Sequence, residues 1–311
     1  MVRKLRRRVP VALGDGEAKA VHEARVSTRR LRASLDLLAP VVPAKMTAPL
    51  RKTARRLRRR LGTMRDLDVM VDVLERLQRR PRYAAAARWM IQQLRDERAK
   101  ARRKAQKKRP AEQLLDRLAA WATLRDQVLQ LGGVIDGLMI TSLRSQWDAF
   151  AAKADARTSN LFDEVCGEDI ANPHELRIAG KMLRYTFEML AEAGHPLPQV
   201  VRPTFKRMQD ALGDWHDCVV LAEHTLRLSL DQSLALCDPA TERKVLELVR
   251  FVLRRGDRAL RRFAALWEGN GRAVAAAVSE IISRLQTDRD RVGSDRPAIA
   301  GGARPNAPSA A

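Results

Sequence analysis

The stretch VHEARVSTRRLR at residues 21–32 has a near copy, PHELRIAGKMLR, at residues 173–184. Five positions are identical: His22 and His174, Glu23 and Glu175, Arg25 and Arg177, Leu31 and Leu183, and Arg32 and Arg184. A second pair of similar segments, LGTMRDLDVM at 61–70 and LGDWHDCVVL at 212–221, follows in the same order. The offsets are 152 residues (22 to 174) and 151 residues (61 to 212), which predicts a duplicated unit.

Both copies of the first stretch place their cations on one side of a predicted helix. At about 100° per residue, the polar stripe of the first copy contains His22, Arg25, Arg29 and Arg32. The matching stripe of the second copy contains His174, Arg177, Lys181 and Arg184. Apolar residues lie behind each stripe, as a helical bundle requires: Leu31, Leu35 and Leu38 in the first copy, and Leu183, Phe187 and Leu190 in the second.

The next predicted helix of each copy carries a second basic row. In the first copy the row consists of Arg51, Arg55, Arg58, Arg59 and Arg65. In the second copy it consists of Arg202, Lys206 and His216. The second row is weaker, because Gln209 and Asp210 stand where the first copy has Arg58 and Arg59. If the two helices of each copy pack side by side, the rows form one basic groove or pore between the copies.

The composition also indicates an anionic partner. Lys and Arg number 59 against 37 Asp and Glu, so the formal net charge is +22 and the pI is about 11.1. Such an excess repels itself unless an anionic polymer or surface relieves it. Apolar residues make up 45% of the chain, enough for a packed core, whereas aromatic residues make up only 4%. Few rings are available for base stacking, which argues against a single-strand nucleic-acid binder.

Helix-forming residues at helical spacing dominate the chain, and strand patterns are nearly absent. Helices are predicted at about 17–39, 44–62, 65–80, 83–108, 111–131, 138–156, 173–193, 199–212, 214–234, 240–268 and 271–286. We expect an all-α fold of two like helical bundles related by a pseudo-twofold axis. The expected domains are a basic N-terminal arm at 1–16, a main domain at 17–286 and a disordered tail at 287–311. Within the main domain, repeat one spans about 17–156 and repeat two about 173–286.

The location expected from the sequence is the cytoplasm. Cys166, Cys218 and Cys237 are too few and too far apart to indicate a disulfide framework. Membrane-span and signal-peptide patterns are also absent, so no membrane association is expected. The run AKARRKAQKKRP at 99–110 is either an outer docking patch or a solvated helix end, and we expect the latter.

Two simpler interpretations of the charged residues were weighed. A basic row on one helix is usually only a solvated face, but acidic partners at helical spacing are mostly missing here, and the row recurs. Acidic residues beside the arginines could bind Mg²⁺ or Ca²⁺: Asp66, Asp68, Asp210, Asp214 and Asp217. Acids in such positions more often orient guanidinium groups or cap helices, so no metal is expected and Asp214 is interpreted as a cap.

The chain resembles the CHAD family, the conserved-histidine α-helical domain. The motifs that carry the resemblance are HEARVSTRRLR, HELRIAGKMLRY, LGTMRDLDV and FKRMQDALGDWHD, and together they extend from about residue 20 to 270. The resemblance implies two pseudo-twofold-related four-helix bundles around a basic pore that binds inorganic polyphosphate, and an association with polyphosphate granules. It assigns binding to His22, Arg25, Arg29, Arg32, His174, Arg177, Lys181 and Arg184. The remaining candidates come mainly from the helical rows: Arg51, Arg55, Arg58, Arg59, Arg65, Arg202, Lys206 and His216.

Three classes of function are compatible with this charge pattern. The expected function is non-catalytic binding of long-chain polyphosphate without a cofactor, with nucleic acid only as a weaker competitor. A nucleic-acid-binding protein is the alternative, although helix-turn-helix, zinc-finger and basic-zipper patterns are missing. An enzyme is less favoured, because Walker A, dinucleotide and zinc-protease motifs are absent. Relatives often carry a triphosphate-tunnel domain with a Glu-x-Glu-x-Lys motif, which this sequence does not contain.

Overall fold

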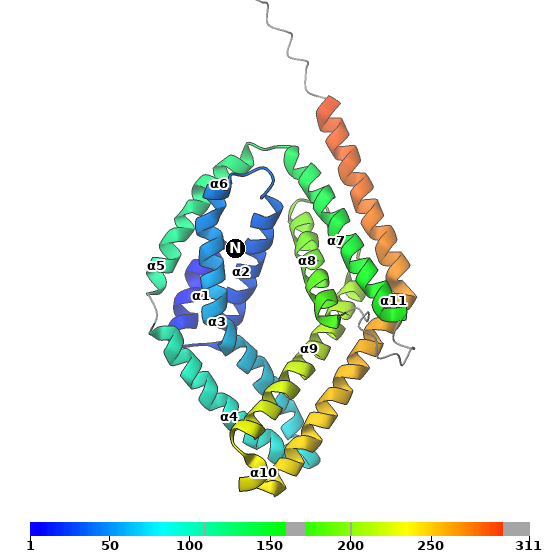
Figure 1. Cartoon of the computed structure of the whole chain (residues 1–311). Helices are drawn as coiled ribbons and strands as arrows, with labels where there is room; N and C mark the ends of the chain where they lie inside the picture. The colour runs from blue at the N-terminus through cyan, green and yellow to red at the C-terminus, as the bar shows by residue number, and fades with distance from the viewer. Residues whose placement is uncertain (108–109, 160–171, 200, 295–311) are drawn as a thin grey trace, which may run out of the picture.

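The computed structural model describes residues 1–107, 110–159, 172–199 and 201–294. Every regular element in these ranges is a helix, which confirms the all-α prediction (Figure 1). The first copy of the basic motif lies on α2 (Ala18–Leu37), and α3 (Ala44–Gln78) follows it. The second copy lies on α8 (Pro173–Glu192), followed by α9 (Arg202–Asp231). Figure 1 shows α2 and α8 facing each other across the middle of the molecule.

The remaining helices surround these two pairs. In the first half they are α1 (Val2–Gly14), α4 (Pro81–Gln106), α5 (Ala111–Asp116), the 3-10 helix η1 (Arg117–Ala119) and α6 (Ala120–Leu129). In the second half they are α7 (Val134–Ser159), α10 (Leu234–Cys237) and α11 (Pro239–Ser294). Proline at the first turn starts α4 and α8, and the Asn172 side chain accepts a hydrogen bond from the His174 backbone N–H at 2.9 Å.

Buried apolar side chains form three clusters. One joins α1, α2 and the first half of α3 to α5, η1 and α6. Another joins α7, α8, the first half of α9 and the second half of α11. The third joins the distal halves of α3 and α9 to α4 and the start of α11, so residues from both halves of the chain share it. This shared cluster holds the ends of the long helices together and fixes how α2 faces α8.

Several predicted breaks between helices are absent. The segments predicted at 44–62 and 65–80 form the single helix α3, and those predicted at 199–212 and 214–234 form α9. The segments predicted at 240–268 and 271–286 likewise form α11. A glycine costs a helix only about 1 kcal/mol relative to alanine, and buried residues continue on both sides of Gly62 and Gly213. By contrast, the helix predicted at 111–131 is divided into α5, η1 and α6.

The two ends of the chain also differ from prediction. The segment predicted as a basic arm forms α1, which buries Val2, Leu5 and Val9 against the first cluster and exposes its cations. The tail predicted to be disordered from 287 begins as helix, because α11 continues to Ser294. The rest of the predicted tail, and Cys166, lie outside the described residues. Cys218 is buried and Cys237 is exposed.

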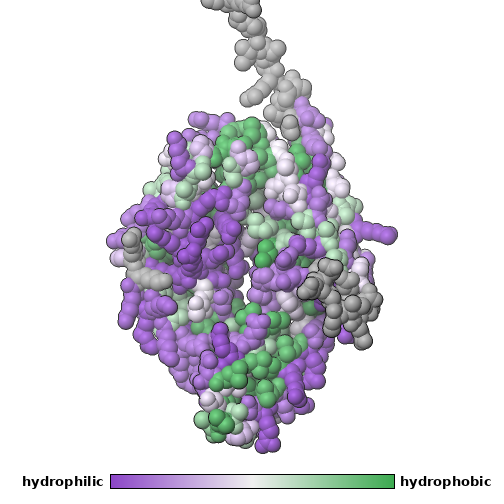
Figure 2. Space-filling model, in the orientation of Figure 1, coloured by the Kyte–Doolittle hydropathy of each residue, from purple (hydrophilic) through white to green (hydrophobic). Residues whose placement is uncertain are grey.

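The visible surface is mostly hydrophilic, with a hydrophobic patch near the end that holds α10 (Figure 2). Exposed leucines of α9 and α10 occur in this part of the fold: Leu226, Leu230 and Leu236. Across the described part of the chain, no helix combines the length and apolar character needed to cross a bilayer.

Candidate anion-binding site

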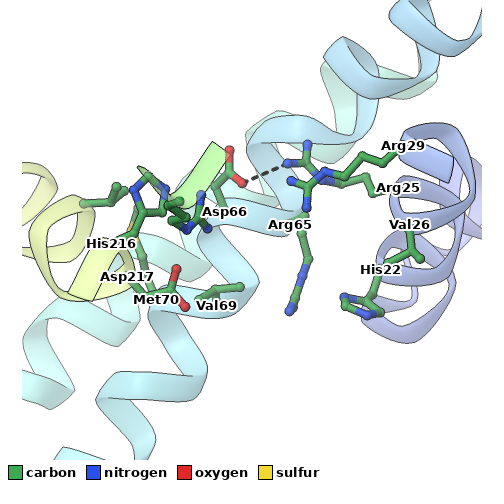
Figure 3. Close-up of a pocket in the computed structure, with 12 residues that line it drawn as sticks. His22, Arg25, Val26, Arg29, Arg65, Asp66, Val69, Met70, His216 and Asp217 are labelled. Atoms are coloured by element: carbon green, nitrogen blue, oxygen red, sulfur yellow. Dashed lines mark hydrogen bonds and ion pairs between the residues drawn. The ribbon is translucent and has the colours of Figure 1, made fainter. Parts of the chain in front are cut away.

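A cavity of about 470 Å³ lies between the two copies, at the place where α2 and α3 face α8 and α9 (Figure 3). We call it the central pocket. Its polar lining consists of His22, Arg25 and Arg29 from α2, Arg65 and Asp66 from α3, Arg177 from α8, and His216 and Asp217 from α9. Val26, Val69, Met70 and Val220 complete the walls. Six of the predicted binding residues therefore meet in one cavity, although they come from segments more than 150 residues apart.

Arg25 is a buried cation of the first copy, with only 9% of its surface exposed. Its guanidinium donates to Asp66 Oδ1 at 3.3 Å and, at 3.4 Å, to the backbone carbonyl of Arg58 (Figure 3). Gly62 leaves room for this side chain, because a Cβ at that position would lie 3.0 Å from Arg25 Nη1. The motif glycine on α3 thus lets Arg25 lie across the helix and point into the pocket.

His22 and Arg65 approach each other from α2 and α3, as Figure 3 shows. Desolvation in the pocket, together with the charges of Arg65 and Arg29, lowers the pKa of His22. The imidazole is therefore neutral at pH 7, with one N–H donor and one acceptor nitrogen. The charges of Arg65 and Arg29 thus add to the effect of burial on this imidazole.

The second copy supplies a group of half-buried cations and a half-buried histidine. Burial lowers the pKa of Arg177 to about 10, and it lowers the pKa of Lys181 to about 7 with the help of Arg177, Arg29 and Arg184. The pKa of His216 falls to about 3 for the same reasons, burial first and then Arg177 and Lys181. The ring of His174 lies 5.4 Å from that of His216. Lys181 and His174 do not line the central pocket, but both adjoin residues that do.

Two acidic residues also line the pocket and were left out of the predicted binding set. Asp66 accepts a hydrogen bond from Arg25 and so orients its guanidinium group, the role expected for acids beside arginines. Asp217 is partly buried, which raises the pKa of its carboxyl group, while the charges of Arg177 and Lys181 act in the opposite direction. Asp66 and Asp217 occupy matching positions of the two motifs, directly after Arg65 and His216. This repetition was the sequence signal that could have placed both acids in the site. One carboxylate from each copy therefore offsets part of the basic lining.

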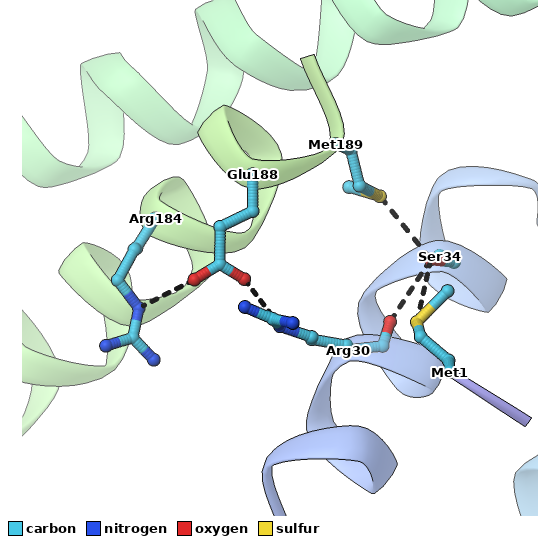
Figure 4. A network of polar contacts seen from close by, with 6 residues as sticks. All are labelled: Met1, Arg30, Ser34, Arg184, Glu188 and Met189. Atoms are coloured by element: carbon cyan, nitrogen blue, oxygen red, sulfur yellow. Dashed lines mark hydrogen bonds and ion pairs between the residues drawn. The ribbon is translucent and has the colours of Figure 1, made fainter. Parts of the chain in front are cut away.

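The other predicted cations lie outside the central pocket. Arg51 and Arg32 both pair with Asp36, and Arg184 pairs with Glu188, which also accepts from Arg30 at 2.8 Å (Figure 4). Arg184, Arg202 and Lys206 line a separate cavity of about 320 Å³ between α8 and α9. Arg55 and Arg58 lie on α3. The charges of Arg32, Arg29 and Arg55 all act on the Arg58 guanidinium and, after burial, lower its pKa. Arg59 borders a further cavity between α3 and α4.

The remaining acids take structural positions rather than a metal site. Asp214 does not cap a helix, because α9 already begins at Arg202; its carboxylate instead accepts from Arg262 at 2.7 Å. Asp68 pairs with Arg98, and Asp210 pairs with Lys206 at 2.9 Å. Among the described residues, no three His, Cys, Asp or Glu side chains are grouped so as to hold a metal ion.

The central pocket has the chemistry of an anion site. The buried Nε donors of Arg25 and Arg177, one from each copy, have no hydrogen-bond partner in the described ranges. Buried donors are normally paired, and a charged donor left without an acceptor is costly. Guanidinium groups bind phosphate oxygens in pairs, and neutral imidazoles can donate to further oxygens. The four arginines outnumber the two carboxylates, so the lining has a net positive charge. An extended anion with several charged groups would accept hydrogen bonds from the arginines of both copies at once.

Comparisons with known proteins agree with this architecture. The solved structure of the CHAD domain from the plant Ricinus communis is similar, with a TM-score of 0.59 and 20% sequence identity, over 89% of this chain and 87% of that chain. No curated protein shows significant similarity to the sequence. The family model of the CHAD domain matches residues 1–227, a range that begins with α1 and includes both basic motifs. The chain therefore belongs to the CHAD domain family.

Proposed function

We propose that this protein binds inorganic polyphosphate in the central pocket and does not hydrolyse it. The observation that carries the proposal is the convergence of two arginines from matching motifs on one cavity: Arg25, which is buried, and Arg177, which is half-buried. Each can grip two oxygens of a phosphate group, and the pocket lies between them. Nucleic acid is the weaker competitor in this proposal, because bases and sugars occupy space that a bare phosphate chain does not.

The role proposed for the chain follows from the ligand. Binding without hydrolysis suits a protein that attaches to polyphosphate in the cytoplasm, including the surface of polyphosphate granules. Arginine and lysine supply the charge, and His22, His174 and His216 supply hydrogen bonds. Binding should weaken as salt rises, because every neutralised phosphate releases condensed counterions.

A competition titration tests the proposal. Labelled long-chain polyphosphate is displaced by single-stranded DNA, double-stranded DNA and heparin at near-physiological salt. The wild-type chain is compared with Arg25→Gln/Arg177→Gln. The control is Arg243→Gln/Lys244→Gln, which removes two exposed cations of α11 that line none of the cavities described above. We expect polyphosphate to compete best, and the pocket variant alone to lose affinity, about a hundredfold if each charged hydrogen bond contributes 1.5 kcal/mol or more.

Equal competition by all polyanions at equal charge, with equal losses in the two variants, would contradict the proposal. Thermal unfolding of each variant distinguishes loss of the site from loss of the fold. Release of phosphate during incubation of polyphosphate with the pure protein would contradict the non-catalytic part.

A further inference from the structure

We propose that a long polyphosphate chain leaves the central pocket on one side only, over Arg58 and Arg59 of α3, and continues onto Lys100 and Lys104 of α4. This inference rests on the proposed function, and it names a second binding segment for the same ligand. It gives a role to Lys100 and Lys104 of the basic run at 99–110, for which a solvated helix end was expected from the sequence.

The first step of the path is the row of cations on α3. Arg58 lies within electrostatic reach of Arg29, which lines the central pocket, and of Arg59, which does not. Arg58 and Arg59 are both exposed, and neither forms an ion pair with any residue that the structure describes. Positive charge therefore continues without interruption from the pocket wall to the outer side of α3.

The second step is a cavity of about 370 Å³ between α3 and α4. Arg59 and Arg60 line it from α3, and Lys100 and Lys104 line it from α4. Arg60 joins the two walls by donating its Nε–H to the Ala105 carbonyl at 2.7 Å. Lys100 and Lys104 lie one helical turn apart, so both ammonium groups can point along the same groove.

One acid, Glu97, also lines this cavity, and within the described ranges it forms no ion pair with either lysine. Glu97 lies 3.0 Å from His224 Nε2 on α9, and this contact occupies one of its oxygens. Lys100 and Lys104 have no ion-pair partner within the described ranges, and both are exposed. Three cations without ion-pair partners, Arg59, Lys100 and Lys104, thus border a groove that adjoins the basic row of α3. Unpaired clusters of this kind attract polyanions more strongly than scattered surface charges.

The second copy offers no equivalent exit. Gln209 and Asp210 replace Arg58 and Arg59, and Asp210 pairs with Lys206 at 2.9 Å. Acids therefore interrupt the basic row on α9 where arginines continue it on α3. The two sequence copies line one pocket, but only the first extends it.

Two ligands of different length test the inference. Tripolyphosphate probes the central pocket alone, whereas long-chain polyphosphate reaches α4. The variant Lys100→Gln/Lys104→Gln is compared with Arg243→Gln/Lys244→Gln, which has the same net charge. Because contacts of exposed charges contribute about 0.2–1 kcal/mol each, we expect the α4 variant to bind long chains roughly two- to thirtyfold more weakly. Its affinity for tripolyphosphate should match that of the control.

The outcomes separate this inference from the proposed function. If the α4 variant and the control bind long chains equally well, the path onto α4 is wrong while the central site stands. Equal weakening for both ligands also overturns the path, because it indicates a general effect of charge. If the wild-type chain binds neither ligand, the proposed function itself fails. Both substitutions lie on exposed helix surfaces, and circular dichroism verifies that the helices remain folded.

Discussion

Arg177 and Lys181 lie one helical turn apart on α8, and burial together with the Arg177 charge lowers the pKa of Lys181 to about 7. The charges of Arg29 and Arg184 act in the same direction, and Asp217 opposes them. Lysine is therefore a proton acceptor near neutral pH here, rather than a permanent cation. The matching position of the first copy is Arg29, which stays charged because guanidinium does not deprotonate in this range. The two copies thus respond differently to pH.

Polyphosphate binding is expected to take up a proton. An anionic chain beside Lys181 stabilises the ammonium form and raises its pKa again. At about pH 8 the lysine is mostly neutral before binding and charged afterwards, so the complex gains a proton. Calorimetry in two buffers with different ionisation enthalpies measures this uptake directly.

The matched variant for proton uptake is Lys181→Arg, which reproduces the residue of the first copy. It is charged before and after binding, so its uptake at about pH 8 should be smaller than that of the wild-type chain. An unchanged uptake would assign the proton to another group, such as His22 or His216, and would contradict this role of Lys181.

Lys181 is also expected to lower the stability of the ligand-free protein. Its folded-state pKa of about 7 lies below the ordinary lysine value of 10.5, so the unfolded chain binds more protons between these values. The free energy of unfolding should therefore rise as pH increases through this window. Lys181→Met should stabilise the ligand-free protein by about 1–4 kcal/mol near pH 7, by removing a buried cation, and should flatten the pH dependence.

Denaturant unfolding between about pH 6.5 and 9 checks both effects, since linkage acts across the interval between the two pKa values. The same substitution is expected to weaken polyphosphate binding. A variant that is less stable than the wild-type chain at every pH would show that Lys181 makes favourable contacts that outweigh its burial.

The sequence predicted the helical class and the faces of the helices better than their ends. Leu31 and Leu183 were placed on apolar faces, and both are fully buried. The spacing of three and four residues on one helix also grouped His22 with Arg25 correctly, because that relationship is local. The breaks predicted after residue 62 and before residue 214 are absent, because the cost of Gly62 and Gly213 is local while the packing that offsets it depends on the opposite helix.

The composition of the pocket required tertiary information. Arg51 was grouped with Arg25, yet it pairs with Asp36 outside the pocket. Arg202 was grouped with Arg177, yet it lines the cavity between α8 and α9. A helical wheel gives the direction of a side chain around one helix, but not which part of that helix faces the other copy. The partners of α2 and α8 decide this, and sequence periodicity does not specify them.

The difference between these two groups gives a further prediction. Arg202→Gln/Lys206→Gln should lower polyphosphate affinity far less than Arg25→Gln/Arg177→Gln, because Lys206 is already paired with Asp210 and neither residue lines the central pocket. We expect at most about a fivefold change, typical of exposed charges. Fluorescence anisotropy with labelled long-chain polyphosphate measures both variants. Equal losses would place the binding path along α9 instead.

Asp66 is expected to limit affinity. Its carboxylate accepts from Arg25 at 3.3 Å and brings a negative charge into the central pocket. Asp66→Asn removes this charge, keeps the shape of the side chain and releases the guanidinium for a phosphate oxygen. Polyphosphate affinity should rise about two- to fivefold, the scale of one partly exposed charge. Asp214→Asn is the matched control, because Asp214 pairs with Arg262 and does not line the central pocket. If Asp66→Asn weakens binding, the main task of Asp66 is to hold Arg25 in place.

The N-terminal helix is expected to be part of the folded domain. Leu5 of α1 is fully buried in the first apolar cluster, with Val9 beside it on the same face. Leu5→Ala should lower the free energy of unfolding by about 2–5 kcal/mol, the range for a buried leucine truncated to alanine. Arg6→Ala, on the exposed face of the same helix, should change it by less than about 0.5 kcal/mol. Denaturant unfolding compares the two variants. Similar small losses in both would mean that α1 does not contribute to the core and acts as the separate basic arm that its charges suggest.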